Sequence, residues 1–323
     1  MEKILLINLP IQTNVMRDIT SDMIYNPPLG ILALGSWIEL NGYTSIVVDL
    51  NYNRISAKEL LENIGKDKPI LIGISSYTEN IEMAVSTARL IKKEYPYIKI
   101  VLGGPHPTLV PEDAINNDYV DFVIRREGEA TLLELLEAIR TKEKSICFDN
   151  IPGLVFKRDG KIIKNVFRGQ IHDLDVLPIP KRELVGMETY RDTVNISTSR
   201  GCPGKCIYCS ARILSGAPYR TRTMENVFLE IVLLKATMKE RINRVYFIDE
   251  TFTALTERVL EFIKIIKIYA LDINWICASR IDIMTEELID HMASSRCEAV
   301  HFGIESGNQE VLDKIQKGID LVY

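Results

Sequence analysis

Three cysteines in one short stretch are the residues whose type and spacing most directly suggest chemistry. Cys202, Cys206 and Cys209 are separated by three and then two residues within "STSRGCPGKCIYCSA", residues 197–211. A disulfide needs two thiols, and a structural zinc site normally takes four ligands. No fourth cysteine or histidine follows nearby. The spacing therefore suits a centre that leaves one coordination position open.

A cubane iron–sulfur cluster fits this pattern, because three thiolates can hold three of the corners that four thiolates normally hold. One iron then keeps an open site for a substrate or cofactor, as catalytic zinc does. A zinc ion with a distant fourth ligand is the alternative interpretation. Cys277 lies in a predicted strand and Cys297 just ahead of one, so both are expected to be core or incidental thiols.

The second half of the chain must position these cysteines, and its pattern predicts repeated βα units. The expected strands are residues 194–199, 244–252, 273–282 and 299–307, separated by helices over 223–240, 256–270 and 285–295, with another helix beginning at 308. Such units form a parallel barrel or part of one, with the chemistry at the carboxyl ends of the strands. The cysteine loop, Asp249-Glu250, Ser279-Arg280 and Glu305-Ser306 all occupy such ends.

The first half predicts a separate α/β domain, since apolar runs alternate with amphipathic helical stretches. The expected strands are residues 3–9, 45–51, 69–76, 98–104 and 121–128, and the expected helices are 30–42, 56–65, 80–96 and 130–141. Nearly continuous apolar strands are typical of a parallel sheet covered on both faces. The prediction is a flavodoxin-like, doubly wound domain that binds ligands beyond the carboxyl ends of its strands.

Three segments follow those strand ends and are candidates for binding: "LPIQTN", "SSYTEN" and "GGPHPT". Gly103 and Gly104 lack a Cβ, so a bulky ligand can approach the backbone; a tight turn is the alternative interpretation. His106 is either a ligand contact or a polar loop residue. No G-x-G-x-x-G follows the first strand, which argues against a dinucleotide site.

A β-hairpin is predicted around Asp159-Gly160, followed by an extended, proline-containing segment. The expected organisation is therefore a first domain over residues 1–145, a hairpin and connector over 146–187, and a second domain over 188–323.

Composition narrows the class of protein. The chain has 323 residues, 46% hydrophobic and 26% charged, with a net charge of −5. No basic stripe indicates a dedicated nucleic-acid binder, although a local basic patch stays open. No apolar run reaches the ~18 residues of a membrane span. A cytoplasmic protein is expected, in which clustered cysteines stay reduced and bind metal or do chemistry.

The cysteine pattern, with aromatic Tyr208 before the last cysteine, resembles the signature of the radical S-adenosylmethionine (SAM) superfamily. More narrowly, the chain resembles the cobalamin-binding radical SAM proteins, the class B methylases, over nearly its whole length. The segments that carry this resemblance are "NPPLGILALGSWIELNGY", "GGPHPT", "DLDVLPIP", "FIDETFT" and "HFGIESG".

The resemblance implies that Cys202, Cys206 and Cys209 hold a [4Fe–4S] cluster whose fourth iron is chelated by SAM. One electron from the cluster would cleave SAM to methionine and a 5′-deoxyadenosyl radical. The SAM-binding positions would be Tyr208, Glu250, Arg280 and Glu305. Arg280 suits a carboxylate and Glu305 an amino or ribose hydroxyl group, while the alternative for the three charged residues is a surface or interstrand salt bridge.

The first domain would then bind cobalamin (B12). The positions that match are Ser75, Ser76, Gly103, Gly104 and His106. The usual cobalamin domain carries D-x-H-x-x-G after its first strand, with the histidine on cobalt. "LPIQTNVM" stands there instead, which implies binding without a histidine ligand.

The second domain departs from the family in length, since four βα units are visible where the barrel usually has six. A truncated product, a fragment, or a split protein completed by a partner chain is expected. Three functions are compatible with this: cobalamin-dependent methylation of an unactivated carbon, cobalamin-dependent radical cyclisation or oxidation, and a non-catalytic remnant. The expected partners are a small-molecule or natural-product substrate and an electron donor such as flavodoxin or ferredoxin.

Overall fold

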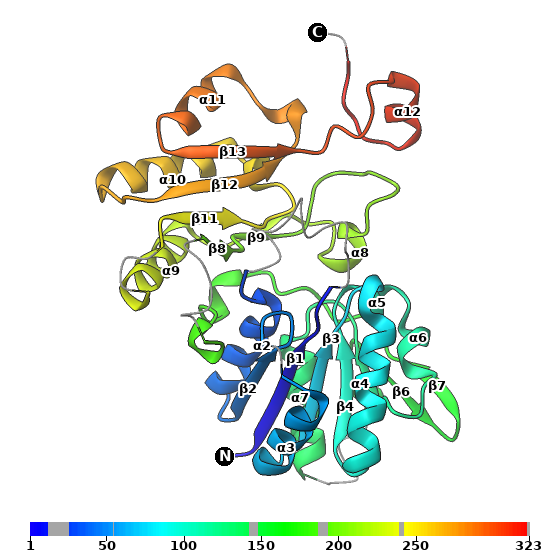
Figure 1. Ribbon diagram of the computed structural model, residues 1–323. Coiled ribbons are helices and arrows are strands. Elements are labelled where there is room, and N and C mark those ends of the chain that lie inside the picture. The colour runs from blue at the N-terminus through cyan, green and yellow to red at the C-terminus, as the bar shows by residue number, and fades with distance from the viewer. Residues whose placement is uncertain (12–25, 54, 142–147, 187–192, 239–241, 322–323) are drawn as a thin grey trace. The chain divides into compact units, whose positions relative to one another are not determined.

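The structure is a computed structural model that describes residues 1–11, 26–53, 55–141, 148–186, 193–238 and 242–321. The chain forms two compact units, which are described separately (Figure 1). One unit comprises Met1–Ile171 and Leu177–Met187, and the other comprises His172–Val176 and Glu188–Tyr323. None of the described helices is long and apolar enough to span a bilayer.

The first unit is built on one sheet with the strand order β2-β1-β3-β4-β5-β6-β7. Its parallel strands are β1 (Lys3–Asn8), β2 (Thr44–Asp49), β3 (Leu71–Ser75), β4 (Lys99–Gly103) and β5 (Phe122–Ile124). The order 2-1-3-4-5 is that of flavodoxin-like sheets, which confirms the predicted α/β class. The chain crosses over between β1 and β3, so the carboxyl ends of these strands lie at the topological switch point.

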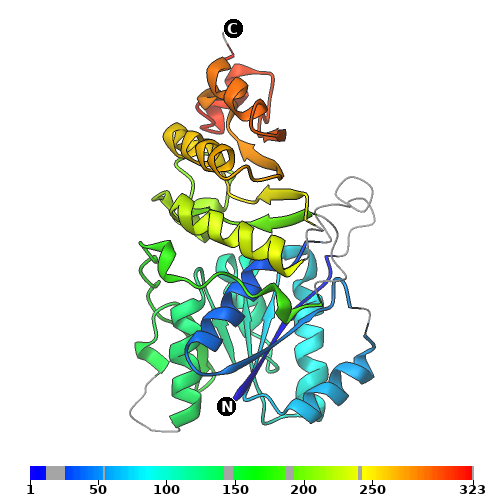
Figure 2. The ribbon, with the colours of Figure 1, turned by 90° about the vertical axis from the view of Figure 1, so that its left-hand side faces the viewer.

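Helices cover both faces of this sheet (Figure 2). They are α2 (Leu29–Leu40), α3 (Ala57–Asp67), α4 (Ile81–Glu94), α5 (Pro105–Leu109), α6 (Pro111–Ile115) and α7 (Glu129–Thr141). One core joins alternate residues of the strands, such as Leu5 and Ile7, to apolar residues of α3, α4 and α6. Helices α2 and α7 contact each other. Alternation along the strands directs Ile4 and Leu6 to the opposite face.

The predicted hairpin is present, but it is part of the first unit's sheet. Strand β6 (Leu154–Arg158) pairs antiparallel with β5, and β7 (Lys161–Lys164) pairs with β6. Asp159 and Gly160 have φ of 50° and 74°, as a tight two-residue hairpin turn requires. The sequence pattern predicts this hairpin, together with the connector after it, as a segment between the two domains. In the structure it covers the edge of the short strand β5, which would otherwise present unpaired backbone groups.

The second unit is a four-stranded parallel sheet in the order β13-β12-β11-β8. The strands are β8 (Thr193–Ile196), β11 (Arg244–Phe247), β12 (Asn274–Ser279) and β13 (Cys297–Phe302). The helices that follow them are α9 (Met224–Thr237), α10 (Thr256–Ile268), α11 (Glu286–Ala293) and α12 (Gln309–Lys314). Among the described residues this is the predicted partial barrel of four βα units.

Aromatic packing holds this second sheet to its helices. The rings of Phe247 and Phe252 stack at 4.4 Å between centroids, and Phe262 of α10 meets Phe247 edge-on at 5.0 Å. Trp275 of β12 is fully buried against the same group. Edge-to-face and stacked aromatic pairs add directional contacts to the hydrophobic burial. The carboxyl ends of β11 and β12 are therefore fixed on a rigid base.

Three predicted strands in this unit have clearly different limits in the structure. The segment 244–252 ends as a strand at Phe247, and Phe252 begins a short 3-10 helix. The segment 194–199 divides into β8 and a separate strand β9 (Ser199–Arg200), which pairs antiparallel with β10 (Arg220–Thr221). The segment 299–307 ends as a strand at Phe302. Glu305 lies beyond it with φ of 68°, a left-handed conformation that cannot continue a strand.

Candidate functional site

The cysteine loop is closed at its base by the two-stranded ribbon of β9 and β10. Gly201, directly before the first cysteine, has φ of 95°. A Cβ at this position would lie 2.2 Å from the carbonyl oxygen of Pro218. Only glycine allows the two sides of the loop to approach this closely. The short helix α8 (Ala211–Leu214) then follows Cys209.

The thiols of Cys202 and Cys206 border a small space beside Gly204. A Cβ on Gly204 would lie 3.3 Å from the Cys202 sulfur and 3.8 Å from the Cys206 sulfur. The backbone N–H of Gly204 donates to the Cys202 sulfur at 3.4 Å, and that of Ala211 donates to the Cys209 sulfur at 3.5 Å. Both amides are therefore directed at sulfur atoms of the loop, and cysteine binds metal through its sulfur.

This donor set fits an iron–sulfur cluster better than a single metal ion. Within the described ranges, no three His, Cys, Asp or Glu side chains come close enough together to hold one ion. A cluster binds each cysteine through a different iron, so the thiols need not converge on one point. The donors on the loop are all sulfur, the ligand type that clusters require.

Asp249 fixes the chain just before the cysteine loop, a role that the sequence did not reveal. Its buried carboxylate accepts hydrogen bonds from the backbone N–H of Thr198 at 2.6 Å and of Ser199 at 3.0 Å, and from the Thr198 hydroxyl. Arg258 completes the network by donating to the Thr198 hydroxyl at 3.1 Å. Burial raises the pKa of Asp249, while these hydrogen bonds act against that shift. The carboxylate therefore links the end of β11 to the start of β9.

Glu250, its neighbour, has a different environment. Its side chain is exposed and accepts a hydrogen bond from the hydroxyl of Ser215 at 2.5 Å. Both residues follow the end of β11 at Phe247, and there Asp249 is buried whereas Glu250 is exposed. Ser215 directly follows α8, so the carboxylate of Glu250 lies near the C-terminal end of the cysteine loop.

Arg280, at the end of β12, links the cysteine loop to the last helix. Its guanidinium forms a bidentate ion pair with Asp282 at 3.0 and 2.8 Å, and donates to the carbonyl oxygen of Lys317 at 2.5 Å. The remaining nitrogen, Nη1, lies 3.8 Å from the Cys206 sulfur. The hydrogen bond with Asp282 raises the pKa of Arg280. A permanent positive charge therefore stands beside the thiol.

Glu305 and Tyr208 meet at a buried lysine. The Lys317 ammonium lies 3.1 Å from the Glu305 carboxylate and 3.4 Å from the Tyr208 hydroxyl. The hydrogen bond from Lys317 lowers the pKa of Glu305. Burial, and the hydrogen bond to Glu305, raise the pKa of Tyr208. Of the predicted residues, the structure thus brings Tyr208 and Glu305 together and places Arg280 against Cys206.

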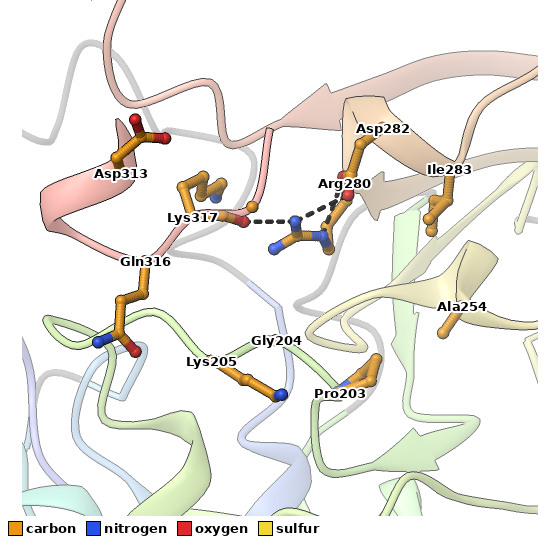
Figure 3. A pocket seen from close by; sticks show the side chains of 11 residues that line it. Pro203, Gly204, Lys205, Ala254, Arg280, Asp282, Ile283, Asp313, Gln316 and Lys317 are labelled. Carbon is orange, nitrogen blue, oxygen red and sulfur yellow. Dashed lines mark hydrogen bonds and ion pairs between the residues drawn. The ribbon is translucent and has the colours of Figure 1, made fainter. Parts of the chain in front are cut away.

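A cavity of about 570 Å³ opens beside the cysteine loop (Figure 3). It is lined by Pro203, Gly204, Lys205, Ala254, Arg280, Asp282, Ile283, Asp313, Gln316, Lys317 and Gly318. Its wall combines the loop between the first two cysteines with residues that follow β11 and β12, and with the end of α12 and the segment after it. Arg280 is in the lining, whereas Glu250 and Glu305 are not. The cavity is large enough for a drug-sized or cofactor-sized molecule.

A second candidate region lies at the carboxyl ends of β3 and β4 in the first unit. Ser76 is fully buried, and its hydroxyl has no hydrogen-bond partner among the described residues. Gly104 has φ of 98°, and a Cβ there would lie 2.8 Å from the Ser76 carbonyl oxygen and 2.9 Å from the Ser75 hydroxyl. Gly104 thus lets the chain pass close to the end of β3, whereas a Cβ at Gly103 would meet only the Ile124 carbonyl oxygen, at 3.8 Å. Of "LPIQTN", residues 12–14 lie outside the described part of the chain.

The expectation that His106 is a polar loop residue is wrong, because His106 lies in the short helix α5 that begins at Pro105. Pro105 occupies the first helical position, where the absent N–H costs nothing. The His106 ring is buried, with Nδ1 3.1 Å from the Thr78 hydroxyl and Nε2 3.1 Å from the Asp113 carboxylate. Both ring nitrogens therefore have partners within the protein.

Comparison with known families gives two matches along this chain. The B12 binding domain family matches residues 23–136, and the radical SAM superfamily matches residues 196–321. The first match includes the edge at β3 and β4, and the second includes the cysteine loop and the residues that line its cavity.

Individual proteins are similar over most of the chain. An uncharacterized methyltransferase of Pyrococcus horikoshii is 32% identical over 98% of this chain and 68% of its own length. An anaerobic magnesium-protoporphyrin IX monomethyl ester cyclase of Synechocystis is 28% identical, over 90% of this chain and 59% of its own length. The chain thus spans between half and about two thirds of the length of such relatives.

Solved structures show the same fold. The cobalamin-dependent SAM radical enzyme OxsB, with aqua-cobalamin and SAM bound, superposes with a TM-score of 0.85 at 20% identity, over 99% of this chain and 46% of that chain. The radical SAM methyltransferase TsrM from Kitasatospora setae, with cobalamin and a [4Fe–4S] cluster, gives a TM-score of 0.79 at 18% identity, over 100% of this chain and 63% of that chain.

Proposed function

Since this chain belongs to the B12-binding radical SAM proteins, we propose that it transfers a methyl group to an unactivated carbon of a small-molecule or natural-product substrate. The observation that carries the proposal is the placement of Cys202 and Cys206 beside Gly204, with the Arg280 guanidinium and an open cavity next to them. When bound, the cluster supplies the electron that cleaves SAM, and cobalamin supplies the methyl group.

The residues around the cavity would bind and orient SAM. Cys202, Cys206 and Cys209 hold the cluster. Arg280 has its Nη1 directed toward both Cys206 and the cavity, so it can bind a carboxylate there while Asp282 keeps the guanidinium in place. Gly204 leaves space between the sulfurs and the guanidinium.

Three further residues would contact the rest of SAM. Tyr208 has a half-exposed ring on the cysteine loop, suited to packing against a flat base. Glu250 and Glu305 have accessible carboxylates suited to an amino group and to ribose hydroxyls. Each is bonded to a protein group, Ser215 and Lys317 respectively, so each would exchange or share that partner when SAM binds.

In the first unit, the edge at β3 and β4 would hold cobalamin. The unpartnered Ser76 hydroxyl is a buried donor that a ligand could use, and Gly103, whose Cβ position meets one atom at 3.8 Å, would allow a bulky ligand to approach the backbone. Gly104 would support this edge by its close contact with Ser75 and Ser76. The hydroxyl of Ser75 lies beside Gly104, 2.9 Å from where a Cβ on that residue would be. His106 would support this edge through Thr78 and Asp113 rather than bind cobalt.

A cyclase reaction is the second candidate, because one relative at 28% identity carries that name. Both reactions begin with the same reductive cleavage of SAM. The two candidates therefore share the cysteine loop and the cavity, and they differ only in the later chemical steps on the substrate.

The test is anaerobic reconstitution of the chain with iron, sulfide, cobalamin and SAM, together with a chemical reductant or reduced flavodoxin. Reductant-dependent formation of 5′-deoxyadenosine supports the proposal. Cys202→Ala, Cys206→Ala and Cys209→Ala should each lose the cluster absorbance, while Cys297→Ala, a half-buried thiol in β13, should keep it. A normal cluster in any of the three loop variants would refute the ligand assignment. Cluster and cobalamin binding without SAM cleavage would favour a non-catalytic binding protein.

A further inference from the structure

Lys317 is a buried cation beside the cysteine loop, and the proposed function names it only as the partner of Glu305. It lies three residues after the end of α12, and only 7% of its surface is exposed. A buried ammonium is costly unless it is paired and hydrogen-bonded. Its partners are the carboxylate of Glu305, at 3.1 Å, and the hydroxyl of Tyr208, at 3.4 Å. One partner belongs to the segment after β13, and the other belongs to the cysteine loop itself.

The backbone around Lys317 makes two more links to the site. The N–H of Ile207, between Cys206 and Cys209, donates to the carbonyl oxygen of Ile315 at 3.1 Å. The carbonyl oxygen of Lys317 accepts from Arg280 at 2.5 Å. The segment 315–317 therefore contacts the cysteine loop through one backbone and one side-chain hydrogen bond, and contacts Arg280 through a third.

Neighbouring residues make room for the Lys317–Glu305 pair. A Cβ at Gly303 would lie 2.7 Å from the Glu305 carboxylate and 3.0 Å from the Lys317 ammonium. Glu305 itself adopts φ of 68°, which turns its backbone away from the line of β13. A non-glycine residue incurs a steric cost in this conformation, so the ion pair is one of the contacts that must hold it.

We propose that Lys317 is a positioning residue for the cysteine loop. Its ammonium holds the Tyr208 hydroxyl and the Glu305 carboxylate, and thereby keeps the stretch from Cys206 to Cys209 against the segment after α12. The relevance of this ordering to catalysis rests on the proposed cluster site. The ordering itself is a property of the chain alone and can be measured without any cofactor.

The first experiment measures amide hydrogen exchange of the full chain without cofactors. Lys317→Met keeps the length of the side chain and removes the charge and the donors. The Ile207 amide, which donates to Ile315, should exchange about tenfold faster or more in this variant. Lys314→Met is the matched control, because Lys314 is exposed on the nearby helix α12 and pairs with Glu310 of that same helix. Its Ile207 amide should exchange as in the unsubstituted chain.

Two further variants separate positioning from a general loss of structure. Tyr208→Phe removes only the hydroxyl that Lys317 contacts, from a ring that is half exposed, and should also accelerate Ile207 exchange. Lys317→Arg retains the charge and should restore most of the protection. Unchanged Ile207 exchange in both Lys317→Met and Tyr208→Phe would overturn the proposal, as would an Arg variant no better protected than the Met variant.

A spectroscopic measurement on the reconstituted protein connects the loop to the cluster. Lys317→Met should alter the electron paramagnetic resonance signal of the reduced cluster, and Lys314→Met should not. Faster Ile207 exchange in a chain that never assembles a cluster would sustain the positioning role and reject the proposed function. If the chain assembles the cluster and cleaves SAM but Ile207 exchange is unchanged in Lys317→Met, the proposed function is supported and the positioning role is rejected.

Discussion

Replacement of Asp249 tests whether one buried carboxylate fixes the entry to the cysteine loop. Asp249 is 3% exposed and accepts three hydrogen bonds from Thr198 and Ser199, two of them from backbone N–H groups. Asp249→Ala leaves these donors buried without an acceptor, at about 1–3 kcal/mol each. It also removes a negative charge that acts on Arg258, itself 7% exposed. Because three donors lose their acceptor, the expected loss in unfolding free energy is at least about 3 kcal/mol.

Asp249→Asn should cost less, because the amide oxygen can still accept from one or both backbone N–H groups. The charge is lost, and an NH₂ group then faces the Thr198 hydroxyl. We expect a loss of about 2 kcal/mol, the usual difference for a hydrogen bond to a charged group. The free energy of unfolding should be lowest for Asp249→Ala, intermediate for Asp249→Asn and highest for the native chain. The two differences separate the contribution of hydrogen bonding from that of charge.

The assay is tryptophan fluorescence, because each of the two units contains one of the chain's two tryptophans, Trp37 and Trp275. Trp275 is fully buried among the aromatic residues of the second unit, so its fluorescence reports unfolding of that unit. A Trp37→Phe background leaves it as the single reporter, and the Trp37 indole N–H has no hydrogen-bond partner to lose among the described residues. Urea unfolding of each Asp249 variant is then compared in this background.

Glu250→Gln is the matched control, since it changes the adjacent carboxylate, which is exposed. Its effect should stay within about 0.5 kcal/mol, as is usual for surface substitutions. If Asp249→Ala unfolds within about 0.5 kcal/mol of the parent protein, the buried acceptor does not hold the loop as described. A loss of similar size in Glu250→Gln would equally refute the distinction between the two carboxylates.

The geometry of the two units supports three other predictions. Gly201→Ala should destabilise the second unit by more than about 1 kcal/mol in urea unfolding, because φ is 95° and the new Cβ would meet a carbonyl oxygen at 2.2 Å; an unchanged midpoint would contradict this. Gly104→Ala should weaken cobalamin binding measured by absorbance titration, whereas Gly30→Ala, with no atom within 4 Å of its Cβ, should bind normally. The lowered pKa of Glu305 means that its ion pair with Lys317 stabilises the fold fully above the ordinary value of 4.5 and loses that contribution as the pH falls through the lowered pKa. The difference in unfolding free energy between the native chain and Glu305→Gln should therefore be constant from neutral pH down to the ordinary pKa of 4.5 and decrease steadily as the pH falls further, and a difference that stays constant in strong acid would refute the assignment.

Local pattern was sufficient for the longer elements and for the thiols. Hydrophobic periodicity located the longer helices and the strands of both parallel sheets, but it did not predict the short elements α5, α6, α8, β9 and β10. The helix predicted to begin at Ser56 does so, and Ser56 and Glu59 form a capping box there. The spacing of Cys202, Cys206 and Cys209 is a property of one loop, so it could be read directly from the sequence. The Asp159-Gly160 turn was equally local, because both residues tolerate a positive φ.

Contacts between distant segments were decided only by the tertiary structure. The hairpin sequence carried no indication that β6 would pair with β5, because strand pairing depends on which edge is left uncovered. Asp249 and Glu250 are adjacent and both are carboxylates. Asp249 is nevertheless buried and accepts a hydrogen bond from the Thr198 backbone, whereas Glu250 is exposed. His106 has partners for both ring nitrogens because α5 turns it inward. Lys317 is separated from Tyr208 by 109 residues, and only the close approach of the segment after α12 to the cysteine loop gives that lysine a role.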